Sequence, residues 1–245
     1  MNRGRDGRAG DVGVSGGGPS YDVLVSGNSY RFEVGGIGIS NTTLIHTADG
    51  PIIFDLGSHV TRDMIKLGLS KRGLNPSDIP RVFLSHLHFD HVMNIDLFPH
   101  TTEVFVSRRE WDYCSNPHPE DDWLPWGIKE QLEKYRLRLV DGTDELSSGV
   151  RYFPAPGHTP GCYAVALDLA DGRKVTLAGD AVKFPREAIR MKADHSFDTK
   201  EVASQSIRTI MEMSDVVVPG HFGELFKEDG RVVWEAIQPL NLIAR

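Results

Sequence analysis

Ser85-His86-Leu87-His88-Phe89-Asp90-His91 is the most informative stretch of this 245-residue sequence. Four side chains that can bind a metal lie within six residues, directly after the apolar run Val82-Phe83-Leu84 that predicts a buried strand. Their spacing does not follow the period of a helix, whereas a loop that turns away from a strand end would let them point at one centre. We therefore predict a metal site at this strand end, with four candidate ligands: His86, His88, Asp90 and His91.

Three further candidates stand in later turns of the chain. His158 lies in a Gly-His-Thr-Pro-Gly segment, Asp180 follows Ala-Gly, and His221 follows Pro-Gly. Each comes after an apolar stretch and has a glycine directly before it, which lets the backbone approach a crowded centre. Imidazole and carboxylate ligands suit Zn²⁺, and also Fe or Mn. Seven ligands are too many for one ion, so we expect two divalent metal ions, with Zn²⁺ as the first choice.

The composition is that of an ordinary globular protein. Apolar residues make up 40% of the chain, charged residues make up 25%, and the formal net charge is −7. This apolar content excludes a chain that is disordered as a whole. An acidic chain repels the phosphates of nucleic acid unless it hides a basic patch. We therefore expect a small molecule as the partner and argue against nucleic acid.

The first 20 residues are rich in glycine and predict a flexible tail, whereas residues 21–245 predict a single domain. No apolar run approaches the roughly 20 residues that a bilayer requires, and none follows the early arginines as in a secretory signal. We therefore expect no membrane partner, a cytoplasmic location, and reduced thiols at Cys114 and Cys162. The sequence leaves open whether the chain forms a homo-oligomer.

Short apolar segments separated by turn residues predict strands along most of the chain, with a few helices between them. Two sheets packed face to face, with helices outside, would satisfy this order. We expect helices over Val60–Leu69, over Gly127–Arg136, and from a cap at Asp198 or Thr199 to about Met213. The expected strands are Tyr21–Val25, Tyr30–Val34, Thr42–His46, Ile52–Asp55, Arg81–Ser85, Glu103–Ser107, Val150–Pro154, Cys162–Leu169, Lys174–Ala178 and Asp215–Val218.

The ordered set His-x-His-x-Asp-His, Gly-His-Thr, Gly-Asp and Gly-His resembles the metallo-β-lactamase superfamily, from Tyr21 to the end of the chain. The resemblance implies an α+β fold, a four-layer αβ/βα sandwich with a two-metal site at one sheet edge. Asp55 matches an early strand-end aspartate of the family, which implies that it orients a ligand or the loop beneath it. The implied ligands are His86, His88 and His158 for the first metal, Asp90, His91 and His221 for the second, and Asp180 as a bridge.

The chemistry of such a centre predicts a binuclear metallo-hydrolase. Two neighbouring cations share one hydroxide and lower the pKa of water to about 7, so that a metal-bound hydroxide attacks a carbonyl or phosphoryl centre. Asp90 is the candidate catalytic residue, as a proton shuttle, besides its role as a ligand. Within the family, an aspartate at the position of Asp180 is typical of the glyoxalase, lactonase and nuclease branches, and true β-lactamases lack it. We therefore expect hydrolysis of a small ester, thioester or lactone.

Other functions compete with this one. Gly50–Ile53 and Asp215–His221 resemble the small-domain subgroup that includes a metazoan histone pre-mRNA nuclease, so phosphodiester cleavage is the first alternative. Gly157–Cys162 resembles the persulfide dioxygenases of the same fold, which hold one iron. Here its ligands would be His86, His158 and Asp180, but the Gly-Arg-Thr-Asp run of those enzymes is absent. A metal-holding scaffold without turnover is disfavoured, because buried polar groups are costly.

Two features near the expected site allow more than one interpretation. Lys183 stands where familiar lactonases carry a tyrosine, and it would face either a substrate anion or solvent. The stretch Trp111–Trp126 is rich in aromatic residues and proline, and predicts either a substrate mouth or a small hydrophobic cluster under a loop. The remaining histidines have no such context and are expected at the surface or in the core: His46, His59, His100, His118 and His195.

Overall fold

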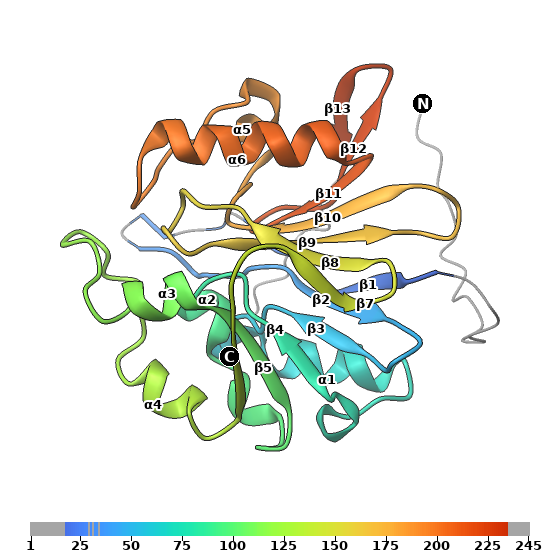
Figure 1. The fold of residues 1–245 in the computed structure, drawn as a ribbon, viewed down its shortest axis with the longest axis vertical. Coiled ribbons are helices and arrows are strands. Elements are labelled where there is room, and N and C mark those ends of the chain that lie inside the picture. Colours follow the sequence, from blue (N-terminus) through green and yellow to red (C-terminus); the bar gives the residue numbers. More distant parts are fainter. Residues whose placement is uncertain (1–17, 29, 31, 34, 235–245) are drawn as a thin grey trace.

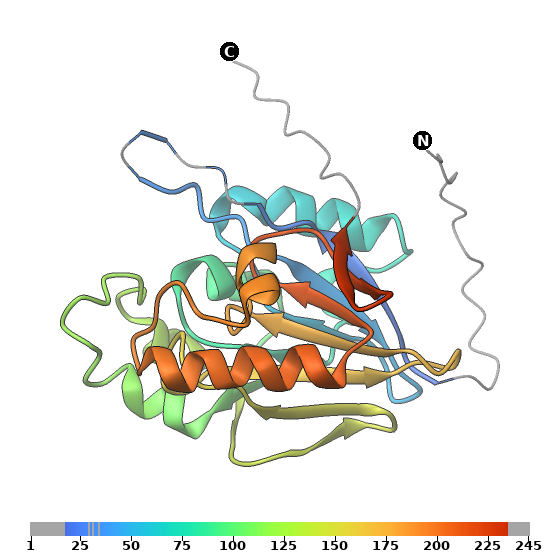
Figure 2. The ribbon, with the colours of Figure 1, turned by 90° about the horizontal axis from the view of Figure 1, so that it is seen from above.

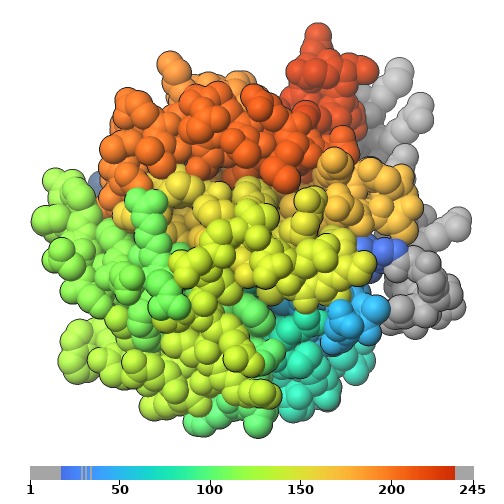
Figure 3. Space-filling view, in the orientation of Figure 1, coloured from blue at the N-terminus to red at the C-terminus, as the bar shows by residue number. Residues whose placement is uncertain are grey.

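Two mixed sheets pack face to face in the computed structural model, and helices cover both outer faces (Figure 1). The structure describes residues 18–234 except 29, 31 and 34. The order of layers is helix, sheet, sheet, helix, which confirms the α+β αβ/βα sandwich expected from the sequence. In the space-filling view, the half with the first sheet and the half with the second meet across the middle of the molecule (Figure 3).

The first sheet follows the order of the chain, β1-β2-β3-β4-β5-β6. Strands β1 to β3 pair antiparallel, and β3 to β6 pair parallel. Its strands are β1 (Ser20–Val25), β2 (Thr42–His46), β3 (Ile52–Phe54), β4 (Arg81–Phe83), β5 (Glu103–Ser107) and β6 (Arg136–Val140). The helices of this half are α1 (Arg62–Ser70), α2 (Phe89–Val92), α3 (Arg108–Tyr113) and α4 (Ile128–Leu132), with 3₁₀ turns η1 (His59–Thr61), η2 (Pro76–Asp78) and η3 (Ile95–Leu97).

The second sheet has the order β13-β12-β11-β10-β9-β8-β7. Its β10 and β11 pair parallel, and its other neighbours pair antiparallel. Two helices, α5 (Pro185–Arg190) and α6 (Lys200–Met213), cover its outer face, with α6 running roughly along the strands (Figure 2). The strands are β7 (Asp144–Ser147), β8 (Val150–Pro154), β9 (Tyr163–Asp168), β10 (Lys174–Gly179), β11 (Val216–Pro219), β12 (Leu225–Glu228) and β13 (Arg231–Trp234).

An aromatic cluster joins the two sheets. Phe83 of β4 is fully buried and lies beside Phe54 of the same sheet, with ring centroids 6.2 Å apart. It reaches Tyr152 of the opposite sheet at 5.4 Å. Burying a side chain of this size stabilises the fold by about 1.5–3 kcal/mol. The interface between the sheets therefore fixes how their ends meet, and the site is built from those ends.

Two local expectations differ from the structure. The helix expected over Gly127–Arg136 ends at Leu132, and Arg136 is the first residue of β6. The segment Arg136–Val140 alternates between exposed and more buried residues and pairs with β5, and this pairing outweighs the helical pattern. Within Tyr30–Val34 the described residues contain no strand, and residues 31 and 34 lie outside the described part.

The expected tail lies almost entirely outside the described residues, which begin at residue 18. Ser20 already pairs with His46, so the first strand starts one residue before the expected domain boundary. Both cysteines are free thiols, as expected. None of the helices that the structure describes has the length and apolarity to cross a bilayer.

Candidate metal centre

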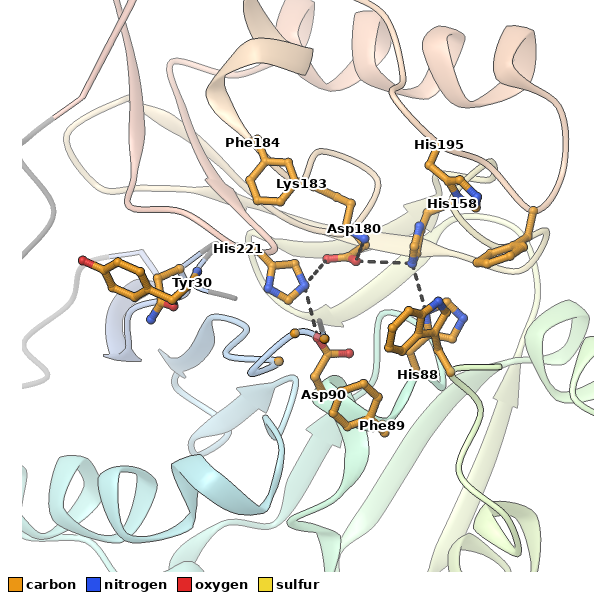
Figure 4. A pocket seen from close by; sticks show the side chains of 16 residues that line it. Tyr30, His88, Phe89, Asp90, His158, Asp180, Lys183, Phe184, His195 and His221 are labelled. Carbon is orange, nitrogen blue, oxygen red and sulfur yellow. Dashed lines mark hydrogen bonds and ion pairs between the residues drawn. The ribbon is translucent and has the colours of Figure 1, made fainter. Parts of the chain in front are cut away.

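The loops that follow β4, β8, β10 and β11 meet at one edge of the sandwich (Figure 4). Five of the seven predicted ligands lie on these loops, and Asp90 and His91 lie on α2, which continues the loop after β4. The predicted reason for the glycines holds at all three positions, since a Cβ on Gly179 would fall 2.6 Å from the hydroxyl oxygen of Ser85. A Cβ on Gly220 would fall 1.9 Å from the carboxylate of Asp180, and one on Gly157 would fall 2.2 Å from the backbone of Ala203. A side chain at either place would push a candidate ligand out of position.

The seven side chains are buried, and their ligand atoms form three overlapping groups. Within each group the ligand atoms lie within 4.8 Å of one another. The three groups are His86, His88 and His158; His86, His91 and Asp180; and Asp90, His91 and His221. The first and last groups are the two ligand sets expected from the sequence, and Asp180 contacts residues of both.

Asp55 and a backbone carbonyl orient two of the imidazoles. His91 Nδ1 lies 2.7 Å from Asp55 Oδ2, and His221 Nδ1 lies 3.0 Å from the carbonyl oxygen of Ile39. Because both partners only accept hydrogen bonds, each Nδ1 carries a proton and each Nε2 is directed at the centre, where it can bind a metal ion in its deprotonated form. Asp55 also accepts hydrogen bonds from the amide and the hydroxyl of Ser85. It therefore anchors the ligand loop as the sequence predicted.

Two more imidazoles, those of His86 and His88, also have one nitrogen engaged outside the centre. His86 Nδ1 lies 3.0 Å from the hydroxyl of Ser85, which donates to Asp55. His88 Nε2 lies 3.1 Å from Asp121, and its Nδ1 lies 3.0 Å from His158 Nε2. The inner nitrogens of His88 and His158 face each other (Figure 4), and the ring centroid of His86 lies 4.6 Å and 4.8 Å from those of His88 and His158.

The unpaired atoms of the cluster show that a cation fits. Within the described part of the chain, buried His86 Nε2, His91 Nε2 and Asp180 Oδ1 have no hydrogen-bond partner. His221 Nε2 lies 3.3 Å from oxygens of both Asp90 and Asp180. Buried acceptors without donors cost about 1–3 kcal/mol each, and a shared cation would satisfy them together. The donor set is that of a Zn²⁺, Fe or Mn site.

The electrostatics of the cluster agree with this fit. Burial lowers the pKa of His86 and of His158 well below the ordinary value, which keeps them in the neutral form that binds metals. Burial would raise the pKa of Asp180, but Lys183 and the surrounding imidazoles hold it well below its ordinary range. Burial would lower the pKa of His91, but Asp180 and Asp55 hold it well above. The centre therefore attracts positive charge.

A cavity of about 440 Å³ opens onto the cluster. Phe89 and Trp123 form one wall, with their rings stacked 6.0 Å apart. Lys183 also lines the cavity, and its ammonium group lies 2.9 Å from Asp180 Oδ2, so it is not a purely solvated lysine. His195 lies at the cavity although it is exposed, a position for which the sequence gave no signal.

The aromatic stretch Trp111–Trp126 combines both interpretations. Trp111 packs against the core of the first half, as a hydrophobic cluster would. Trp123 is half exposed and lines the cavity, as a substrate mouth would. Trp126 is 99% exposed. None of the five histidines expected outside the site belongs to a candidate metal group of the described residues: His46, His59, His100, His118 and His195.

Sequence reasoning missed two acidic residues that hold the ligand loops. Asp121 contacts His88, and the fully buried Glu110 accepts hydrogen bonds from the amide of Leu87 and the hydroxyl of Thr159. A weak signal existed for Glu110, because Ser107-Arg-Arg-Glu110 matches a helix capping box. Ser107 does cap α3, but the glutamate side chain turns inward to the two ligand loops.

Comparisons with known proteins agree with this fold and site. A family model described as the metallo-beta-lactamase superfamily matches residues 35–221. Metallo-beta-lactamase domain-containing protein 1 of Rattus norvegicus is 32% identical over 219 residues, covering 87% of this chain and 76% of that protein. An N-acyl homoserine lactonase of a Bacillus species is 25% identical over 205 residues, covering 73% of this chain and 79% of the lactonase.

Solved structures give the same picture of the fold. AidC, a dizinc quorum-quenching lactonase, matches with a TM-score of 0.64 at 22% identity, over 82% of this chain and 80% of AidC. At this identity the likeness concerns the fold alone. The sandwich with seven converging ligands defines a metal-binding protein of the αβ/βα class. The chain belongs to the metallo-beta-lactamase superfamily.

Proposed function

We propose that this protein is a metal-dependent hydrolase of small esters, thioesters or lactones. It would work with two divalent metal ions, and Zn²⁺ is the metal we expect first. The observation that carries this proposal is the convergence of seven buried candidate ligand side chains, three of which, His86, His91 and Asp180, have an inner atom without a hydrogen-bond partner among the described residues. Two lines of support come from relatives: N-acyl homoserine lactonases match the sequence, and a dizinc lactonase shares the fold.

The residues of the chain divide the work. His86, His88 and His158 would hold one ion, while Asp90, His91 and His221 would hold the other, with Asp180 between them. When bound, the ions would activate water as the nucleophile and polarise the bond to be cleaved. Asp90 lines the cavity as well as the cluster, which places its carboxylate where it can take a proton from the nucleophile and pass it to the leaving group.

The cavity sets the size and character of the substrate. A volume of about 440 Å³ suits a small molecule and not a long polymer. The stacked rings of Phe89 and Trp123 offer an apolar surface for an acyl group, while Lys183 places a positive charge beside the cluster. Ester, thioester and lactone substrates combine such an apolar part with a carbonyl that the centre can attack.

Metal analysis followed by a substrate panel tests the proposal. We expect two ions per chain, and turnover of at least one class among lactones, thioesters and esters. Asp180→Ala and His88→Ala should each lower the metal content and reduce kcat by at least about a hundredfold. Asp63→Ala is the control, because that side chain is 93% exposed. Full turnover with undiminished metal in either ligand variant would overturn the assignment.

Phosphodiester cleavage is the second candidate, favoured by the resemblance of Asp215–His221 to the subgroup with a nuclease. The same panel decides between them when it includes bis(4-nitrophenyl) phosphate and single-stranded RNA. Turnover of these with none of the carboxylic substrates would replace the first proposal. One Fe per chain with oxygen uptake would instead favour the dioxygenase.

A further inference from the structure

Asp121 lies outside the proposed ligand set, yet its side chain is fully buried beside it. Its Oδ2 lies 3.1 Å from His88 Nε2 and accepts a hydrogen bond of 2.6 Å from the hydroxyl of Tyr113. Its Oδ1 accepts a hydrogen bond of 3.2 Å from the amide of Trp123. Every contact of this carboxylate is therefore with a donor.

This arrangement fixes the tautomer of His88. An ionised carboxylate only accepts hydrogen bonds, so His88 Nε2 carries the proton and Nδ1 presents its lone pair to the centre. Tyr113 cannot reverse the direction of the network, because its oxygen already accepts a hydrogen bond from the amide of His118, and its own proton points to Asp121. The rotation of the ring and the position of its proton are both set from outside the metal centre.

The same carboxylate holds the wall of the cavity. Asp121 and Trp123 lie on the segment between α3 and α4, and the amide of Trp123 is anchored on Asp121. The carbonyl of Trp123 in turn accepts a hydrogen bond from the amide of Phe89, which follows His88 in the chain. A closed path of contacts thus runs from His88 through Asp121 and Trp123 back to the ligand loop.

We propose that Asp121 is a positioning residue that fixes the metal-binding tautomer of His88 and couples the first metal position to the cavity wall at Trp123. The inference rests on the proposed function only in so far as the centre binds metal. It predicts that an uncharged side chain of the same shape fails at this position. An asparagine must turn its NH₂ group either toward two donors, His88 and Tyr113, or toward the donor amide of Trp123.

Asp121→Asn, compared with Asp122→Asn, tests this inference. Asp122 is the adjacent residue and is exposed, so it is a matched control. Zn²⁺ affinity is measured by competition with a chromophoric chelator, and the Co²⁺-loaded proteins are compared by their visible absorption spectra. We expect Asp121→Asn to weaken one of the two binding steps by about 10–100-fold and to alter the Co²⁺ spectrum. At saturating metal its KM should rise while kcat recovers, and Asp122→Asn should match the wild type.

The outcomes separate this inference from the proposed function. Affinity within twofold of the wild type together with an unchanged Co²⁺ spectrum in Asp121→Asn would overturn the inference, whatever the substrate is found to be. Metal binding by the wild type without any hydrolysis would overturn the proposed function but leave this comparison valid. If Asp121→Asn does not fold, as judged by circular dichroism, Asp121→Ser replaces it. That variant removes the carboxylate that contacts His88 Nε2, and an unaltered Co²⁺ spectrum in it would overturn the inference.

Discussion

Asp55 and Asp121 perform the same chemical task from two different kinds of scaffold. Each carboxylate contacts the outer nitrogen of a candidate ligand, His91 for Asp55 at 2.7 Å and His88 for Asp121 at 3.1 Å. Asp55 directly follows β3 and also anchors the amide and hydroxyl of Ser85, whereas Asp121 lies on a connection between two short helices. Asp55, at a strand end, therefore fixes its ligand relative to the core of the fold. Asp121, on a loop, fixes its ligand relative to the cavity wall at Trp123.

Replacing the strand-end support should have the largest effect. Asp55→Ala leaves buried donors on Ser85 and His91 without an acceptor, and each such donor costs about 1–3 kcal/mol. We expect the free energy of unfolding of the metal-free protein to fall by about 3–5 kcal/mol, as measured by urea denaturation in the presence of EDTA. Asp63→Ala serves as the exposed control. A loss as small as that of the control would show that Asp55 serves only the metal.

Glu110 extends the comparison to a carboxylate that touches both ligand loops without touching a ligand. Burial raises the pKa of Glu110, while the hydrogen bonds from Thr159 and Leu87 lower it in part. A raised folded-state pKa gives stability that is fully present below the unfolded value of about 4.3 and is lost as pH rises through the folded value.

Glu110→Gln should therefore remove this loss and flatten the dependence of stability on pH above about 4.3. The fold should tolerate the change, because the new NH₂ can donate to Thr159 Oγ1, whose proton can turn to Cys162 Sγ 3.1 Å away. Urea denaturation across pH measures the effect, and Glu130→Gln at an exposed position is the control. A pH profile that follows the wild type would contradict this prediction.

The smallest effect should come from the side chain of the wall itself. Trp123→Ala removes the ring that stacks on Phe89 but keeps the backbone amide, which still donates its hydrogen bond to Asp121. We expect a loss of about 1 kcal/mol in substrate binding, which is about a fivefold rise in KM, with unchanged metal affinity. Trp126→Ala, at a 99% exposed position, is the control. A drop in metal affinity would mean that the ring and not the backbone carries the coupling.

The sequence predicted the parts of the site that depend on local pattern. His86 to His91 follow a strand, and Gly220 is required because a Cβ there would collide with Asp180, so order and spacing alone locate them. The four-layer fold followed from the alternation of short strands and helices. Asp121 could not be found in this way, because its partner His88 lies 33 positions away and only the path of a loop brings them together.

Competition between local and tertiary preferences explains the remaining differences. The segment Gly127–Arg136 has the pattern of an amphipathic helix, but its last residue, Arg136, pairs with the edge of the first sheet as the first residue of β6. Glu110 has the position of a capping residue, but two buried donors offer it stronger contacts than the helix end does. In both cases the deciding partner is distant in the chain.

The ligands come from both halves of the sandwich, since the loop after β4 belongs to the first sheet and those after β8, β10 and β11 belong to the second. Metal ions bound at this edge of the sandwich would cross-link the two halves. Loading would then raise resistance to proteolysis throughout the chain and not only in the loops nearby. Neither half could bind both metal ions alone. Binding of two ions would therefore show that the two sheets are packed together.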